Sequence, residues 1–241
     1  MAQYIYGKNV CIQRLKDGKP IRQMYLLDGI KDQELERLAN KRGVLIEKVN
    51  RKKLDTLSKG GRHQGIMLVV DDYKTVSVDE ILSRIPQDKK GLLVMLDQLE
   101  DPHNLGAILR TCDAVGADGV IVRKNNSVGL NATVAKVSTG AIDTIPVAEV
   151  SNLSSTLEDL KKKGYWVYGS DAKNAVDYRS PAYDTPVVLV VGSEGKGISR
   201  LVKEHCDQMV CLPMEGEVTS LNASVACAIL LYQIHSKRFP L

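Results

Sequence analysis

Five apolar runs, nearly continuous rather than alternating, dominate the chain from Gly91 onward. They are GLLVMLDQL, GVIVR, YWVYGSD, PVVLVVG and QMVCLP, and helical patterns separate them. Strands that are apolar on both faces are typical of a parallel sheet covered by helices on both sides. The sequence therefore predicts an α/β domain with buried strands over residues 91–241.

A smaller α/β unit is indicated before it. Short β-rich runs (IRQMYLLDG, GVLIEKV and GIMLVVDDY) alternate with polar helical stretches (DQELERLANKR and NRKKLDTLSK). We predict a first domain over residues 1–73, a size that folds as a unit. Residues 74–90 are polar and hold one short amphipathic turn and a proline, so we expect a linker there.

Composition narrows the class of protein. The 241 residues are 44% hydrophobic, and no segment reaches the roughly 20 apolar residues that span a bilayer, so we expect a cytoplasmic protein without membrane contact. The five cysteines form no C-x-x-C pair and the four histidines are scattered, so we expect reduced thiols and no metal site. The net charge of +4 permits a polyanionic partner without requiring one.

The first segment that could carry chemistry is LDQLEDPHNLGAILRTCDAVGADGVIV. It predicts a strand, a turn at Asp101 and Pro102, and a helix that begins near Asn104, which suits an N-cap. A helical wheel places the apolar residues on one face and Arg110 almost opposite, so Arg110 should point away from its own sheet. Two interpretations stay open: a solvated arginine, or a charge presented to a partner subunit or a phosphate.

The second segment is PVVLVVGSEGKGISRLVKEHC, in which a strand runs into a glycine-rich turn at 192–197 before a helix. Such a turn brings backbone N–H groups close to a ligand. A phosphate loop is disfavoured, because Gly197 follows Lys196 where a hydroxyl residue is needed, and G-x-G-x-x-G is absent. Glu194, in the middle of the turn, is unusual there, although it would also suit a helix start.

The third segment is CLPMEGEVTSLNASVACAILLYQ. A short strand ends at Pro213, a polar loop follows, and we expect Thr219 or Ser220 to cap the final helix. Ser220, Asn222 and Ser224 gather hydrogen-bonding groups at one helix start, and capping explains at most two of them. A ligand-facing site and a plain helix cap both remain open.

Three motifs in this order, N-L-G-A-I-L-R, G-S-E-G-K-G and L-P-M-E-G-E-V-T-S-L-N-A-S-V-A, closely resemble those of the SpoU/TrmH family of RNA ribose 2′-O-methyltransferases. The resemblance covers about residues 90–241. The N-terminal segment, with R-H-Q-G-I at 62–66, looks like the substrate-binding domain of the bacterial subgroup that modifies a guanosine in 23S ribosomal RNA.

The resemblance implies a C-terminal α/β domain with a trefoil knot of SPOUT type, joined to a small ribosomal-protein-like α/β domain that binds substrate. It also implies S-adenosylmethionine as the cofactor, structured RNA as the substrate and a homodimer as the assembly. The matching catalytic positions are Asn104, Arg110, Glu194, Ser220 and Asn222. The cofactor-binding positions are Gly192, Leu212 and Leu221, with Gly140 in a nearby turn of V-S-T-G-A.

Methyl transfer to a ribose hydroxyl needs aligned reactants and no metal, so positioning should supply much of the acceleration. We expect Arg110 to stabilise the developing alkoxide by its charge. Basic runs at 41–42, 51–53 and 59–63 would capture RNA by its phosphates. A transfer RNA methyltransferase and a catalytically silent, RNA-binding ribosome assembly factor remain as alternatives.

Overall fold

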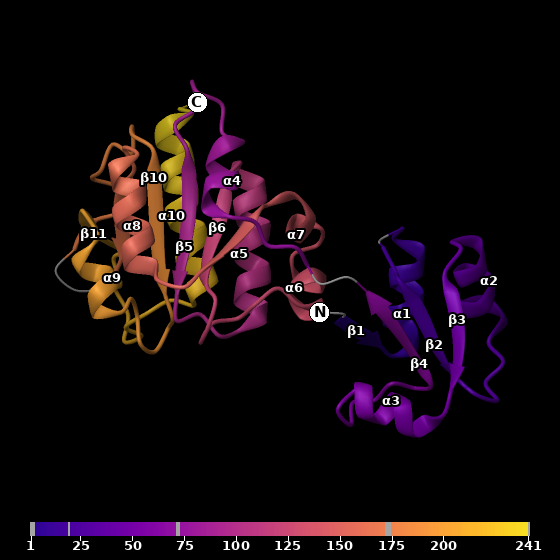
Figure 1. The fold of residues 1–241 in the computed structure, drawn as a ribbon. Coiled ribbons are helices and arrows are strands. Elements are labelled where there is room, and N and C mark those ends of the chain that lie inside the picture. The colour runs from indigo at the N-terminus through magenta and orange to yellow at the C-terminus, as the bar shows by residue number, and fades with distance from the viewer. Residues whose placement is uncertain (1–2, 19, 71–72, 172–174, 241) are drawn as a thin grey trace. The chain divides into compact units, whose positions relative to one another are not determined.

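The computed structural model describes residues 3–18, 20–70, 73–171 and 175–240 (Figure 1). The chain divides into two compact units, Met1–Tyr73 and Lys74–Leu241. Each unit has its own sheet and its own hydrophobic core.

The first unit is built on a four-stranded sheet of spatial order β1-β4-β2-β3. β2 pairs parallel with β3, whereas β4 pairs antiparallel with β1 and β2. The strands and helices predicted between residues 20 and 73 are confirmed; β1 and α1 carry no periodic signal and were not expected. In chain order the elements are β1 (Gln3–Tyr6), α1 (Lys8–Lys16), β2 (Gln23–Leu27), α2 (Gln33–Lys41), β3 (Leu45–Val49), α3 (Arg51–Leu57) and β4 (Ile66–Val70).

Helices cover both faces of this first sheet. Leu15 of α1 and Leu35 of α2 are buried in one core cluster with Met24 and Leu68 of the strands. On the other face, Leu54 of α3 is buried in a second, smaller cluster. The fully apolar β4, one of the two inner strands, therefore contacts both helical layers.

His63, in the R-H-Q-G-I segment, has a structural role in this unit. It is buried, and its Nε2 lies 2.9 Å from Asp55 Oδ1 of α3. Its Nδ1 accepts a hydrogen bond of 3.0 Å from the backbone N–H of Gly65. The imidazole thus joins α3 to the turn that begins β4.

The second unit contains a seven-stranded sheet of order β7-β6-β5-β10-β8-β11-β9, in which every pairing is parallel. Its strands are β5 (Leu92–Asp97), β6 (Gly119–Arg123), β7 (Val147–Val150), β8 (Trp166–Ser170), β9 (Val176–Asp177), β10 (Val187–Gly192) and β11 (Gln208–Cys211). Its helices are α4 (Val78–Ser83), α5 (Pro102–Val115), α6 (Ala132–Val137), α7 (Ala141–Thr144), α8 (Leu153–Lys162), α9 (Arg200–Glu204) and α10 (Ala223–Arg238).

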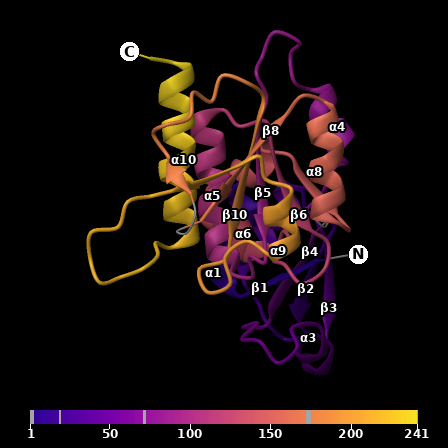
Figure 2. The ribbon, with the colours of Figure 1, turned by 90° about the vertical axis from the view of Figure 1, so that its left-hand side faces the viewer.

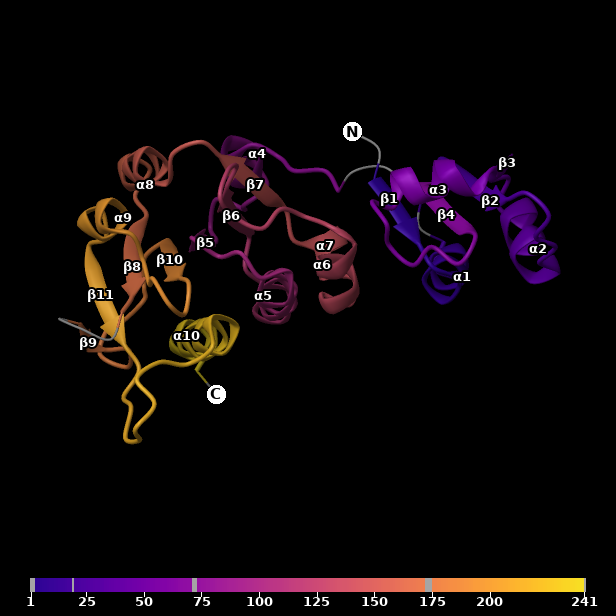
Figure 3. The same cartoon turned by 90° about the horizontal axis from the view of Figure 1, so that it is seen from below.

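Helices cover both faces of this sheet, which explains why its apolar runs do not alternate with polar residues. Leu93 and Met95 of β5 pack in one core cluster with Leu157 of α8 and Val202 of α9. α5 and α10 lie side by side on the opposite face (Figure 3). A strand between two helical layers buries every side chain, as all six residues of β5 do.

The segment 74–90, in which we expected a linker, contributes to the packing of this second unit. It contains α4, capped by Ser77, whose hydroxyl accepts from the N–H of Glu80. Ile81 is fully buried in the core of the sheet. The apolar residues of the amphipathic turn therefore begin the second unit before Gly91.

The chain returns across the sheet near its C-terminus. From β11 it runs through the loop 212–222 to α10, which packs on α5 and contacts β10 (Figure 2). The predicted α/β fold with a smaller N-terminal α/β domain is confirmed. This arrangement is consistent with the knotted SPOUT fold that the resemblance implied.

Within the described ranges, no helix is long and apolar enough to cross a membrane. All five cysteines are free thiols, and Cys11, Cys112 and Cys227 are buried. Burial raises the pKa of the Cys11 and Cys227 thiols to about 12, which keeps them protonated at neutral pH. They serve as small apolar residues of the core.

Candidate active site

Parallel strands bring their carboxyl ends to one edge of the second sheet. β5 ends at Asp97, β8 at Ser170 and β10 at Gly192, and these three strands are neighbours. The chain continues from β5 into β6 on one side, whereas β10 lies on the other side of β5, so the strand order reverses between β5 and β10. Ligands of open α/β sheets bind outside the carboxyl ends of strands at such a reversal.

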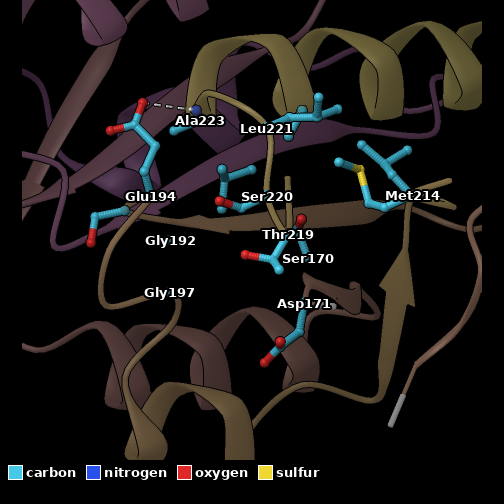
Figure 4. A pocket seen from close by; sticks show the side chains of 14 residues that line it. Ser170, Asp171, Gly192, Glu194, Gly197, Met214, Thr219, Ser220, Leu221 and Ala223 are labelled. Atoms are coloured by element: carbon cyan, nitrogen blue, oxygen red, sulfur yellow. Dashed lines mark hydrogen bonds between the residues drawn. The ribbon is translucent and has the colours of Figure 1, made fainter. Parts of the chain in front are cut away.

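A cavity of about 200 Å³ lies at this edge (Figure 4). Gly192 and Ser170 line it from the ends of their strands, and the loop 212–222 lines it from the other side. Thr219 and Ser220 supply hydroxyl groups, while Leu221 adds apolar surface. Mixed walls of this kind suit a small ligand held by a few polar groups.

Glu194 is the centre of a hydrogen-bond cluster beside this cavity. Its Oε1 accepts from Asn104 Nδ2 at 3.0 Å and from Asn222 Nδ2 at 2.7 Å. The same oxygen accepts from the backbone N–H of Ala223 at 3.1 Å, the contact drawn in Figure 4. Asn222 Nδ2 also donates to Asn104 Oδ1 at 2.9 Å. All three sequence motifs therefore meet at one carboxylate.

Asn104 does not cap its helix, contrary to our expectation. α5 begins at Pro102, and Asp101 is the N-cap, with its side chain accepting from the N–H of His103 at 2.9 Å. Pro102 at the first helical position fixes this start. Asn104 is therefore the third residue of α5 and is buried, and its amide is free to donate to Glu194.

The predicted cap of the final helix is also wrong. Asn222, not Thr219 or Ser220, is the N-cap of α10, and its Oδ1 accepts from the N–H groups of Ser224 and Val225. Because Oδ1 caps the helix, the amide nitrogen of Asn222 points to Glu194. The side chain of Asn222 thus links the start of α10 to the Glu194 cluster. Glu194 also supplies negative charge at the N-terminal end of α10, which is the positive end of the helix dipole.

The glycine-rich turn is closed by backbone contacts. Gly197 N donates to Ser193 O at 2.8 Å, and a Cβ on Gly192 would lie 2.1 Å from the carbonyl carbon of Gly197. Asp97 is buried at the end of β5, and its Oδ2 accepts from Ser199 N at 2.7 Å. The turn is thereby fixed at both ends against neighbouring strands.

The structure brings most of the predicted site residues together. Ser220, Gly192, Leu212 and Leu221 line the cavity with Glu194. Asn104 and Asn222 join it through the Glu194 cluster.

Two predicted site residues lie elsewhere. Arg110 is exposed on α5, as the helical wheel predicts, and its side chain makes no hydrogen bond or ion pair in the described part of the chain. Gly140 begins α7 with φ 104° and is not among the residues that line the cavity. Within one chain, the guanidinium is therefore separate from the cluster.

Ser170, Asp171 and Met214 are among the residues that line the cavity and that sequence reasoning missed. Asp171 also forms an ion pair with Lys203 of α9. A signal for the first two exists: they are the last two residues of the predicted strand YWVYGSD, and the end of such a strand lies at the ligand edge of a parallel sheet. Met214 belongs to the third motif but has no distinctive pattern.

No group of three or more histidine, cysteine, aspartate or glutamate side chains in the described ranges is arranged to hold a metal ion. The cavity is lined by hydroxyl groups, backbone and apolar side chains, together with two carboxylates, those of Asp171 and Glu194. These groups suit a nucleoside-sized organic ligand, with hydrogen bonds to its polar edges and apolar contact with its flat faces.

Comparison with known proteins agrees with this geometry. Residues 91–232 match the SpoU rRNA methylase family, and residues 4–76 match the substrate-binding domain of RNA 2′-O ribose methyltransferases. A Bacillus subtilis protein, named as a TrmH-family tRNA/rRNA methyltransferase on a provisional basis, is 46% identical over 98% of this chain and 96% of its own.

Solved structures show the same fold. An rRNA methyltransferase from Sinorhizobium meliloti, crystallised with AdoMet bound, has a TM-score of 0.72 and 26% identity over 100% of this chain and 88% of its own. The TrmH/SpoU tRNA-modifying enzyme of A. aeolicus has a TM-score of 0.58 and 31% identity over 66% of this chain and 81% of its own.

Proposed function

Because this chain belongs to the SpoU rRNA methylase family, and is therefore an S-adenosylmethionine-dependent RNA 2′-O-ribose methyltransferase, we propose that it methylates a guanosine of 23S ribosomal RNA. The observation that carries the activity is the cluster in which Asn104 and Asn222 converge on Glu194 at the edge of a nucleoside-sized cavity. The substrate-binding match over residues 4–76 supports RNA as the substrate.

The cavity fits the cofactor. Gly192, Leu212 and Leu221 bring backbone to its wall, and Ser220 and Thr219 bring hydroxyl groups that suit a ribose. A side chain at Gly192 would collide with the backbone of Gly197 in the turn, so this part of the cavity wall requires glycine. When bound, S-adenosylmethionine supplies an electrophilic methyl group on a positively charged sulfur.

The residues of this chain then position the ribose hydroxyl and stabilise its developing charge. Glu194 and Asn222 orient the two loops and the target ribose through the hydrogen bonds of the cluster. Arg110 provides a permanent positive charge that stabilises the alkoxide, and an RNA phosphate accepts the proton. Arg110 itself is not the proton acceptor, because a guanidinium in a protein already carries its proton.

We further propose that two copies form a homodimer and that Arg110 acts on the partner's site. α10 exposes an apolar stripe of Val225, Ile229 and Tyr232, at 47%, 36% and 54% exposure, with the spacing of one helix face. α10 packs on α5, the helix that carries exposed Arg110. A two-fold contact through these helices would bury the stripe and bring each guanidinium to the other subunit.

The first unit would capture RNA by its phosphates. Arg51 and Lys52 of α3 and Lys59 just after it are exposed. Arg42 and His63 of the basic runs contribute less, because Arg42 donates to the carbonyls of Arg14 and Leu15 and His63 is buried. Contacts of lysine and arginine with phosphates position the RNA on the protein but do not recognise its base sequence.

The alternatives make different predictions. The name of the Bacillus subtilis relative leaves transfer RNA open, and the A. aeolicus structure is a tRNA-modifying enzyme. A silent assembly factor would have no need of the intact Asn104, Glu194 and Asn222 cluster.

The decisive experiment incubates the protein with labelled S-adenosylmethionine and either unmodified 23S ribosomal RNA or unmodified transfer RNA, followed by nucleoside analysis. We expect 2′-O-methylguanosine in the ribosomal RNA only. Methylation of transfer RNA would support the proposed reaction but refute 23S ribosomal RNA as the substrate. Cofactor binding without transfer to either RNA, or to ribosomal particles, would favour the assembly factor.

A further inference from the structure

A second cavity, of about 530 Å³, lies outside the carboxyl ends of β5 and β6. Gln98 and Glu100 line it from the segment that follows β5. Arg123, the last residue of β6, and Asn126 line it from the next connection, and Lys196 lines it from the glycine-rich turn. Every part of this wall comes from the ligand-binding edge of the parallel sheet.

This cavity is adjacent to the Glu194 cluster. Ser193, Glu194 and Gly197 of the turn line the first cavity, whereas Lys196 of the same turn lines the second. The two cavities therefore lie on either side of one short turn. A ligand in the second cavity would be next to the groups that align the methyl acceptor.

The lining groups match the chemistry of a nucleotide. Arg123 is exposed and suits a phosphate. Within the described residues the ammonium group of Lys196 forms one ion pair, with Glu100 at 3.8 Å, and both side chains are about 70% exposed. So weak an ion pair would yield readily to a phosphate. Gln98 and Asn126 each carry donors and an acceptor, and neither side chain forms a hydrogen bond within the described residues.

Gln98 and Asn126 also share an uncommon backbone conformation. Their φ angles are 59° and 57°, in the left-handed region that residues other than glycine seldom adopt. Such conformations gather at ligand sites, where the surrounding structure holds them. The backbone at both residues is thus constrained beside the same cavity, and within the described residues their amides remain available for a ligand.

We propose that this second cavity receives the target nucleotide of the RNA, with its phosphate against Arg123 and Lys196 and its base edge against Gln98 and Asn126. The proposal rests on the proposed function, because it assigns the acceptor site of that same reaction. It places cofactor and acceptor in separate cavities that meet at residues 193–197.

Steady-state methyl transfer with Arg123→Gln and Asn126→Gly tests the proposal. Glycine keeps the backbone conformation of Asn126 and removes only the side chain. We expect Arg123→Gln to raise KM for RNA about tenfold and to lower the salt dependence of binding by about one phosphate contact. Asn126→Gly should raise KM severalfold with an unchanged salt dependence, and both variants should bind S-adenosylmethionine normally.

Adjacent residues outside the cavity supply matched controls. Lys124→Gln removes one positive charge and Asn125→Gly one amide, next to the tested positions but outside the lining. We expect both controls to keep KM for RNA within about twofold of the unaltered protein. Equal effects of test and control variants would overturn the proposal, as would equal losses of cofactor and RNA binding.

A direct probe separates failure of this proposal from failure of the proposed function. If the unaltered protein methylates neither RNA, the proposed function has failed, and guanosine 3′,5′-bisphosphate then tests the cavity by calorimetry. The unaltered protein and Lys124→Gln should bind it, and Arg123→Gln should bind it about tenfold more weakly. Binding that is absent, or equal in all three proteins, would refute the acceptor site.

Discussion

At the residue scale, Arg110 stands apart from the other site residues because no described residue forms a hydrogen bond or ion pair with its side chain. Its side chain is exposed, so truncation should change the stability of the fold little. We expect Arg110→Ala to lower kcat by at least about a hundredfold, the usual cost of losing a group that stabilises an oxyanion. The urea midpoint and S-adenosylmethionine affinity should not change. Near-normal turnover would refute the electrostatic role.

Substitution of Glu194, unlike that of Arg110, should lower the stability of the fold, because one of its oxygens accepts three hydrogen bonds. Glu194 and Asn222 are exposed, so water can replace part of the lost acceptor, and we expect Glu194→Ala to lower the free energy of unfolding by about 1 kcal/mol and to slow methyl transfer. Glu194→Gln keeps an acceptor oxygen and should lose less of both. Urea unfolding and a turnover assay measure the two losses. An alanine variant as stable as the glutamine variant would contradict the cluster.

At the scale of elements, the turn between β10 and α9 contains a matched pair of glycines. A Cβ on Gly192 would meet the backbone of Gly197 at 2.1 Å, whereas a Cβ on Gly195 would meet nothing within 4 Å. Gly192→Ala must therefore displace the turn, and we expect at least a tenfold weaker S-adenosylmethionine affinity by calorimetry, whereas Gly195→Ala should bind normally. Similar affinities for both variants would show that the turn does not shape the cofactor wall.

The elements show what a single sequence can and cannot reveal. Apolar runs as long as β5 and β10 identify strands because every side chain is buried. β7 has only four residues, of which Glu149 is exposed, and gives no such signal. The N-caps of α5 and α10 were predicted at the wrong residues. Capping preferences do not show which of several neighbouring polar residues caps the helix and which one hydrogen-bonds to a distant part of the chain. Asn104 and Glu194 are 90 positions apart, and no local pattern relates them.

At the scale of the whole molecule, the two units should be separable in function. The first unit has its own sheet and core clusters, so its removal leaves the second core intact. We expect deletion of residues 1–73 to preserve S-adenosylmethionine affinity, weaken RNA binding and flatten its dependence on salt, because phosphate contacts are lost. Filter binding over a salt series measures this. An unchanged salt slope would mean that the first unit does not capture RNA by its phosphates.

A mixing experiment tests whether one active site draws on two copies of the chain. If Arg110 acts on the partner's site, a mixed dimer of Arg110→Ala and Glu194→Ala subunits contains one site with both groups intact and one site with neither. Random co-refolding gives half mixed dimers, so about one quarter of the normal activity should return from two impaired proteins. If Arg110 acts within its own chain, every site lacks one group and mixing restores nothing beyond the average of the parents. Each parent refolded alone is the control, and sedimentation shows whether mixed dimers form. Recovery would therefore establish both the homodimer and the direction in which Arg110 acts.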